Sequence, residues 1–450
     1  MARKKKNPVW AFFSSVKLAL FLLFILAATS IIGTVVQQNE PYDRYVQEYG
    51  KRLADLMQVL GFTDMYNSWW FLSLLAIFAL NLIVCSLDRI PNVIRIVRKD
   101  NLDTDPSRLE KMKIRKGLVS DRPLEETAGR VEEYIRSKGW KPARRELANG
   151  ILVFAQKGGW TRFGVYVVHT SILVILLGAI IGSPRVARNI LHKQDFAFKG
   201  GIMLPETRST DTITSYLTGE KIPLGFTLRC NYFLIEYYDN GMPKTYLSNV
   251  TVLENGQEVL TTDIKVNTPL TYRGITFYQS SYQPFEEFIA LIRKHDSDLG
   301  LKQIIPAGKQ MRWDEAGILF GISNLEGHGE SIHRVKIWFT DQQGPASRFW
   351  LTVGDEATVK RPSGDYSVIV KQWYATGLQA SKDPGVLLVY LGCGLMLVGL
   401  LIAFFMSHRK IWAYVSAGEG GTAVLFAGTA NKNKVGFEKK FAELTDGLAF

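Results

Sequence analysis

Cysteine is scarce in this sequence. Its 450 residues include three cysteines, Cys85, Cys230 and Cys393, and no two of them form a C-x-x-C pair. The missing pair argues against a thioredoxin-like thiol reductase, whose chemistry needs two neighbouring thiols. The largest polar segment of the chain contains only Cys230, so it forms no internal disulfide. We interpret Cys230 as a small, buried hydrophobic residue on a strand.

The sequence motifs of common hydrolases and nucleotide-binding enzymes are also absent. The chain has no G-x-x-x-x-G-K-[ST] loop to hold phosphates, no G-x-S-x-G nucleophile turn and no H-E-x-x-H metal pair. The net charge is +12, but the basic residues do not alternate with aromatic residues in a stripe, as they do in many nucleic-acid-binding proteins. The sequence therefore indicates neither an independent hydrolase nor a nucleic-acid partner.

Hydrophobic residues make up 47% of the chain and are concentrated in four uncharged runs. Each run is close to the roughly 20 residues that a helix needs to cross a bilayer. We predict transmembrane helices at residues 18–36, 69–87, 163–183 and 384–407. The first run is too long for a signal-peptide core, and no A-x-A cleavage pattern follows it, so we interpret it as a retained span.

Lysine and arginine are distributed unequally around these runs, and cytoplasmic loops carry the excess of positive charge. Basic clusters occur in residues 1–17 ("MARKKK"), at the start of residues 88–162 ("DRIPNVIRIVRKD") and at the start of residues 408–450 ("SHRK"). The first loop, residues 37–68, holds three Lys or Arg against five Asp or Glu. We therefore expect both termini in the cytoplasm, and residues 37–68 and 184–383 on the other side of the membrane.

Residues 88–162 are predicted to form a small cytoplasmic α+β region. Apolar residues between Leu124 and Ile135 recur at helical spacing, and Gly139 is placed to end the helix. Two short apolar runs then flank Asn149-Gly150, a pair that is typical of a two-residue hairpin turn.

Residues 184–383 have the alternation of a β domain. Aromatic and β-branched residues alternate through "FTLRCNYFLIEYYDNGMPKTYLSNVTVLENGQEVLTTDIKV", where "DNG" and "ENGQ" are turn signals. We expect an all-β, sandwich-like extracytoplasmic domain. The C-terminal residues 408–450 have the pattern of a glycine-rich hairpin and a short helix, whose role the composition does not indicate. The predicted fold class is thus a membrane protein of α plus β type with four transmembrane helices.

The third apolar run, "GVYVVHTSILVILLGAIIG", contains one histidine, His169. A polar ring in hydrocarbon must find a hydrogen-bond partner, a metal or a water-lined cavity, and an ionisable residue at this depth is a candidate functional site. His169 lies about 9 Å inside the cytoplasmic end of the run, at about 1.5 Å per residue. Two interpretations are open: a ligand of a metal or of haem, or a hydrogen bond between two helices of the bundle.

Five stretches, in this order along the chain, resemble the ResB (CcsB-type) family of system II cytochrome c maturation. They are "NEPYDRYVQEYG" after the first span, "GVYVVHTSILVILLGAIIG" as the third, "VNTPLTYRGITFYQSSY" in the β domain, "KDPG" before the fourth span and "SHRKIW" after it. The resemblance extends from the first span to "SHRKIW" and leaves the residues after Trp412 outside it.

This resemblance implies a multi-pass subunit of the bacterial inner membrane. The subunit works with a CcsA/ResC-type partner to carry haem outward and to support its attachment to apocytochrome c. It is at most one subunit of a haem lyase, because the partner's W-G-x-x-W-x-W-D stretch is absent here and "SWWF" does not replace it.

The resemblance favours His169 as a haem ligand, since a neutral imidazole nitrogen is a good axial donor to haem iron. His408 is a second, less favoured candidate, because its neighbours Arg409 and Trp412 also suit an anchor among lipid headgroups. In the β domain we expect solvent-exposed or hydrogen-bonded rings for the remaining histidines, His192, His295, His328 and His333.

The run "VNTPLTYRGITFYQSSY" has two interpretations. It can form a pair of core strands that turn at Gly274, or it can form a surface for apocytochrome c, since tyrosine is favoured at interfaces. The exposure of three side chains distinguishes the two: Tyr278, Gln279 and Tyr282.

A different class of function also remains open, namely a cofactor-free membrane scaffold that holds the maturation partner and the apocytochrome. Transport of a small molecule by this chain alone is poorly supported, because the four spans show no internal repeat and no paired broken helices. A haem absorption band in the purified protein would distinguish a haem-binding subunit from a scaffold.

Overall fold

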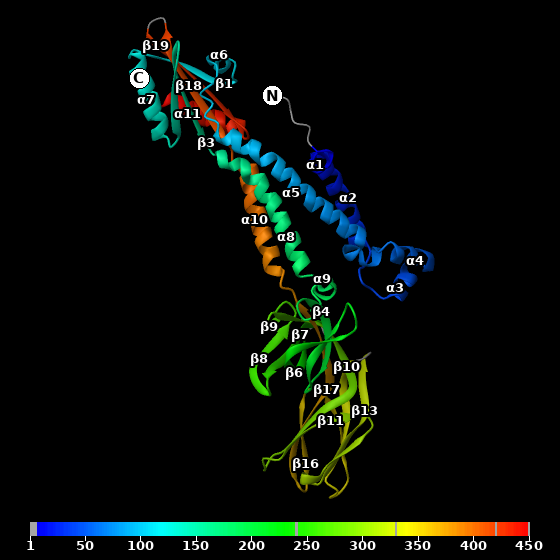
Figure 1. The fold of residues 1–450 in the computed structure, drawn as a ribbon. Helices are drawn as coiled ribbons and strands as arrows, with labels where there is room; N and C mark the ends of the chain where they lie inside the picture. Colours follow the sequence, from blue (N-terminus) through cyan, green and yellow to red (C-terminus); the bar gives the residue numbers. More distant parts are fainter. Residues whose placement is uncertain (1–6, 239–241, 329–330, 419–420, 449–450) are drawn as a thin grey trace. The chain divides into compact units, whose positions relative to one another are not determined.

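The computed structural model describes residues 7–238, 242–328, 331–418 and 421–448, and it divides into two compact units (Figure 1). Unit 1 consists of residues 1–178 and 387–450, and unit 2 consists of residues 179–386. The basic segment 1–6 and the predicted "DNG" turn at 239–241 lie outside the described residues.

Among the described residues, four helices are long and apolar enough to cross a membrane, as predicted. They are α2 (Val16–Val35), α5 (Trp69–Arg98), α8 (Gly164–Ile181) and α10 (Val386–Phe405). Helix α5 is longer than the predicted span, because it continues through Pro91 to Arg98. Arg95 and Arg98 in its last turn favour this extension, since cations stabilise the negative end of a helix dipole.

Shorter helices flank these spans in unit 1. Helix α1 (Pro8–Phe13) precedes α2, and the loop between α2 and α5 folds into α3 (Tyr42–Tyr49), α4 (Lys51–Val59) and the 3-10 helix η1 (Phe62–Asn67). A second 3-10 helix, η2 (Gly159–Phe163), leads into α8.

Unit 1 also contains a five-stranded antiparallel sheet in the order β1-β19-β18-β3-β2. Helices α7 and α11 pack on one face of the sheet and α6 packs on the other. We call this part the five-stranded domain. Its elements are α6 (Pro106–Glu110), β1 (Ile114–Ser120), α7 (Leu124–Ser137), β2 (Lys141–Leu147), β3 (Gly150–Lys157), β18 (Arg409–Gly418), β19 (Gly421–Ala430) and α11 (Lys434–Asp446).

The local predictions for this domain agree with the structure in most respects. The apolar face of α7 is buried at Ala128, Val131 and Ile135, and the helix ends before Gly139, which has a φ of +74° that glycine adopts without strain. The predicted hairpin joins β2 and β3, but Gly150 pairs with Leu147, so the turn begins one residue earlier than expected. The C-terminal hairpin and helix are present, and they complete the same sheet as residues 114–157.

Unit 2 begins with the C-terminal turn of α8 and the short helix α9 (Pro184–Asn189), and the rest is a β domain with two sheets. Ten strands form one sheet in the order β11-β10-β17-β4-β5-β6-β7-β8, with β16 also paired to β17 and β9 to β10; β12 to β15 form a four-stranded sheet. The strands are β4 (Phe198–Pro205), β5 (Ser209–Ser215), β6 (Lys221–Tyr237), β7 (Pro243–Glu254), β8 (Gln257–Lys265), β9 (Leu270–Tyr272), β10 (Ile275–Lys294), β11 (Gly300–Pro306), β12 (Gln310–Trp313), β13 (Ile318–His328), β14 (Ser331–Thr340), β15 (Ser347–Thr352), β16 (Glu356–Arg361) and β17 (Gly364–Lys382), with the 3-10 helix η3 (Asp314–Ala316) after β12.

The β domain has two hydrophobic cores that share the long strands β10 and β17. The first core, around Phe226 and Phe277, is enclosed by strands of the ten-stranded sheet alone. The second core, around Phe288 and Phe339, lies between the ten-stranded and four-stranded sheets. The predicted β, sandwich-like packing is therefore confirmed, with two cores along one pair of strands.

Candidate functional site

His169 lies in the second turn of α8, and its side chain is half-buried. Its ring nitrogen Nδ1 is 2.9 Å from the hydroxyl oxygen Oγ of Ser86 on α5. The ring of Tyr166, one turn earlier on α8, stands edge-on to the imidazole with ring centroids 6.1 Å apart. One polar contact thus joins the apolar helices α5 and α8.

The contact with Ser86 uses only one of the two ring nitrogens of His169. When Nδ1 carries the proton and donates it to Ser86 Oγ, Nε2 keeps its lone pair. No hydrogen bond reaches Nε2 from the part of the chain that the structure describes. Proteins commonly orient a metal-binding histidine through a hydrogen bond to its other nitrogen. The geometry is therefore compatible with both a helix–helix hydrogen bond and a ligand.

The residues around His169 fit haem better than a free metal ion. Within the described ranges, no group of three or more His, Cys, Asp or Glu side chains could hold a metal ion. A haem iron needs only axial ligands from the protein, because the macrocycle supplies its other donors. A single imidazole on an otherwise apolar helix matches that requirement.

His408, the second candidate, has a different environment. It is buried and lies in the chain between α10 and β18. Its Nδ1 accepts a hydrogen bond from Nε of Arg162 at 2.8 Å. Its Nε2 lies 2.9 Å from Oε1 of Gln156. Burial, and then the positive charge of Arg162, lower the pKa of His408 to about 4. The ring is thus neutral with its proton on Nε2 and no free lone pair, which contradicts its prediction as a haem contact.

The other histidines and the cysteines have structural or surface positions. His192, His295 and His333 are exposed, as expected, and the side chain of His328 lies outside the described residues. Cys230 is fully buried on β6, and its burial, together with the nearby Glu206 carboxylate, raises its pKa to about 12. All three cysteines are free thiols.

Two polar residues of α5 contribute to the membrane region but were not singled out from the sequence. Ser86 is the partner of His169, and Asn81 is fully buried, with its Nδ2 donating hydrogen bonds to the carbonyls of Phe13 at 2.7 Å and Ser15 at 3.2 Å. Asn81 therefore stabilises the break between α1 and α2. The signal available in the sequence was a neutral polar residue within the second apolar run, at position 81 and again at position 86.

The run that includes Gly274 forms the β9–β10 hairpin, in which Ile275 and Phe277 are buried. Gln279 accepts hydrogen bonds from Ser248 and Thr376, and Tyr282 stacks between Phe233 and Tyr246. Tyr278 is 45% exposed. The segment is therefore mainly a core strand pair, as the first interpretation predicts, with one tyrosine left at the surface.

These features define a class of protein: a membrane protein with four apolar helices, a histidine within one of them, a discontinuous five-stranded domain and a large β domain. The sequence matches the ResB-like family over residues 16–370 and 357–442. The chain belongs to this family. The match also extends past Trp412, further than the sequence motifs indicated.

Several curated proteins are similar to the chain over nearly its whole length. "Cytochrome c biogenesis protein CcsB" of Synechococcus sp. (strain JA-3-3Ab) is 27% identical, with 99% of this chain and 91% of that protein covered. The proteins of the same name from Gloeobacter violaceus and Crocosphaera subtropica are each 28% identical, over 98% and 97% of this chain, and 91% and 93% of theirs.

Proposed function

We propose that this chain is an inner-membrane subunit of cytochrome c maturation which, with a CcsA/ResC-type partner, carries haem across the membrane and supports its covalent attachment to apocytochrome c. Membership of the ResB-like family and the names of the relatives support a role in cytochrome c maturation. The observation that carries the haem assignment is the contact between Ser86 and His169 within the apolar helices.

In this proposal His169 would hold the transported haem through its free Nε2. Ser86 accepts the proton of Nδ1, which selects the tautomer whose Nε2 lone pair is free. The ring lies at the contact between two largely apolar helices, α5 and α8. Haem iron supplies the affinity for imidazole, and the chain contributes the orientation of the ring.

The chain does not provide a second axial histidine among the described residues of its apolar helices. His408 cannot fill this role, because Arg162 and Gln156 occupy its nitrogens. The second ligand therefore comes from the partner subunit or from another copy of this chain. The β domain is the part that meets apocytochrome c.

The test replaces His169 with alanine and compares the purified full-length protein with a matched Thr170→Ala variant, in which the exposed neighbour on α8 is changed. We expect His169→Ala to lower the haem absorption per protein by more than about tenfold, since loss of even a supporting hydrogen bond costs 10- to 100-fold in metal affinity. Thr170→Ala should leave it unchanged, and added imidazole should partly restore haem to His169→Ala. Equal haem in all three proteins would refute the ligand assignment.

The alternative function, a cofactor-free scaffold, gives a different result in the same preparations. A scaffold yields a colourless wild-type protein that still co-purifies with the partner. Expression of the wild type without any CcsA/ResC-type protein, in a host lacking its own maturation genes, should yield no covalent cytochrome c. Formation of covalent cytochrome c in that host would show that this chain acts as the whole synthase.

A further inference from the structure

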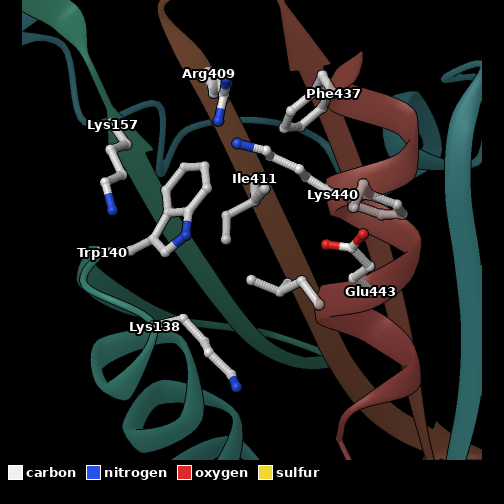
Figure 2. Close-up of a pocket in the computed structure, with 10 residues that line it drawn as sticks. Lys138, Trp140, Lys157, Arg409, Ile411, Phe437, Lys440 and Glu443 are labelled. Atoms are coloured by element: carbon white, nitrogen blue, oxygen red, sulfur yellow. The ribbon is translucent and has the colours of Figure 1, made fainter. Parts of the chain in front are cut away.

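The five-stranded domain contains a pocket of about 290 Å³ that has no part in the His169 site (Figure 2). It lies between the end of α7, the start of β2, the end of β3, the start of β18 and α11. Its apolar lining consists of Trp140, Ile411, Phe437, Phe441 and Leu444.

Four cations and one carboxylate surround this apolar lining. The cations are Lys138, Lys157, Arg409 and Lys440, and the carboxylate is Glu443. No ion pair joins any of these cations to a carboxylate of the described residues. In Figure 2, Arg409 from β18 and Lys440 from α11 point toward each other. Like charges that share one space repel each other, and a bound anion removes that cost.

Arg409 provides a second, independent observation. Its Nε is buried and has no hydrogen-bond partner within the described structure. A buried donor without a partner is uncommon in folded proteins and calls for an acceptor. A guanidinium group can bind the oxygens of phosphate with two parallel hydrogen bonds, so an oxyanion is an acceptor that suits this side chain.

The pocket adjoins the membrane-facing ends of two strands. Lys157 is the last residue of β3, and only Gly158 and η2 separate it from α8. Arg409 is the first residue of β18, and residues 406–408 separate it from α10. A phosphate group can therefore reach these cations from a lipid headgroup or from solution.

We propose that this pocket binds a phosphate group attached to an apolar body. Arg409 and Lys440 hold the phosphate, Trp140 contacts the apolar part, and Glu443 accepts a hydrogen bond from a hydroxyl of the bound molecule. The source is an anionic phospholipid or a soluble phosphorylated compound. This binding function is additional to haem handling and uses no residue of the His169 site.

The test uses the full-length protein in detergent and a double variant, Arg409→Gln with Lys440→Gln. The matched control is Arg145→Gln with Lys439→Gln, two exposed cations of the same domain that do not line the pocket. Native mass spectrometry measures the affinity for added phosphatidylglycerol against phosphatidylcholine, and titration calorimetry at constant ionic strength measures binding of inorganic phosphate. The single variant Lys440→Gln is measured as well, because Lys440 is exposed on α11 and its replacement leaves the fold intact even if the double variant does not fold.

We expect the wild type and the control to bind one of the phosphate probes and the double variant to bind it about 25-fold more weakly, at roughly fivefold per cation. Binding of phosphatidylglycerol alone identifies the membrane as the source, and binding of inorganic phosphate identifies a soluble ligand. Either result supports the pocket. If neither probe binds the wild type, or if Lys440→Gln and the double variant bind as tightly as the control, the proposal is wrong. None of these outcomes depends on haem content.

Discussion

His169 and His408 carry the same imidazole ring, but their neighbours give them opposite properties. Ser86 contacts one nitrogen of His169 and leaves the other available, while Arg162 and Gln156 occupy both nitrogens of His408. Arg162 donates to His408, so the ring must stay neutral to accept this bond. One histidine is thus suited to bind a ligand and the other to join β18 to β3 and η2.

The environment of His408 predicts a pH dependence for the five-stranded domain. The pKa of His408 is lowered from 6.5 to about 4, so between these values the unfolded state binds a proton that the folded state does not. The contribution of His408 to stability is therefore complete above about pH 6.5 and falls as the pH decreases toward 4, by at most about 3.5 kcal/mol at about 1.4 kcal/mol per pKa unit. Hydrogen exchange of β3 and β18 amides at pH 7 and pH 5, corrected for intrinsic rates, measures the loss.

A His408→Gln variant serves as the reference for this measurement, because glutamine keeps a hydrogen-bonding side chain but does not titrate. We expect its β3 and β18 amides to lose much less protection between pH 7 and pH 5 than those of the wild type. An equal loss in the two proteins would assign the pH dependence to other groups.

Among the elements, α8 and α10 pack through small residues. Gly164, Ser171 and Gly178 are buried on α8 at intervals of seven residues, and Gly392 and Gly399 are buried on α10 at the same interval. A Cβ at Gly399 would lie 2.8 Å from Cγ2 and 2.9 Å from the backbone N of Val168. Small residues allow membrane helices to approach closely, and that approach provides their packing energy.

We therefore expect Gly399→Leu to destabilise the pair by about 1 to 3 kcal/mol, the usual cost of overpacking. The matched control is Gly394→Leu on the same helix, where a Cβ meets no atom within 4 Å. The thermal unfolding midpoint and the yield of the two variants in detergent measure the difference. Equal midpoints would mean that α8 and α10 do not pack through these small residues.

At the scale of the whole molecule, the chain returns to a domain that it has already begun. After β3 it passes through α8, the β domain and α10, and β18 then pairs with β3 so that Arg409 is opposite Lys157. Strands of one sheet must lie on the same side of a membrane. The two apolar helices between these strands, α8 and α10, are an even number of spans, which is compatible with the prediction that each crosses the membrane once.

Labelling of single cysteines tests this topology. We expect Asp298→Cys, in an exposed turn of the β domain, to react with a membrane-impermeant maleimide on intact spheroplasts, and Ala148→Cys, in the exposed β2–β3 turn, to react only after permeabilisation. The wild type is the control for the native thiols, because Cys85 and Cys230 are buried but Cys393 is exposed on α10. The reverse labelling pattern would show that the chain has the opposite orientation in the membrane.

The sequence alone determined the features that depend on local composition and spacing. Uncharged runs of about 20 residues have few alternatives to a membrane helix, the apolar spacing from Leu124 to Ile135 suits only a helix with one buried face, and alternation in residues 184–383 indicates strands. His169 was recognisable as a candidate because a titratable ring is costly within an apolar run.

Only the tertiary structure decided the features that depend on contacts between distant residues. Ser86 and His169 are 83 positions apart, and Arg162 and His408 are 246 positions apart, so no local pattern relates them. The role of the C-terminal hairpin depends on distant partners, because β18 pairs with β3, β19 pairs with β1, and the sheet they complete buries its apolar face against α7 and α11. The pocket of the five-stranded domain has no counterpart in the linear sequence for the same reason, because its cations come from the C-terminal cap of α7 and from β3, β18 and α11.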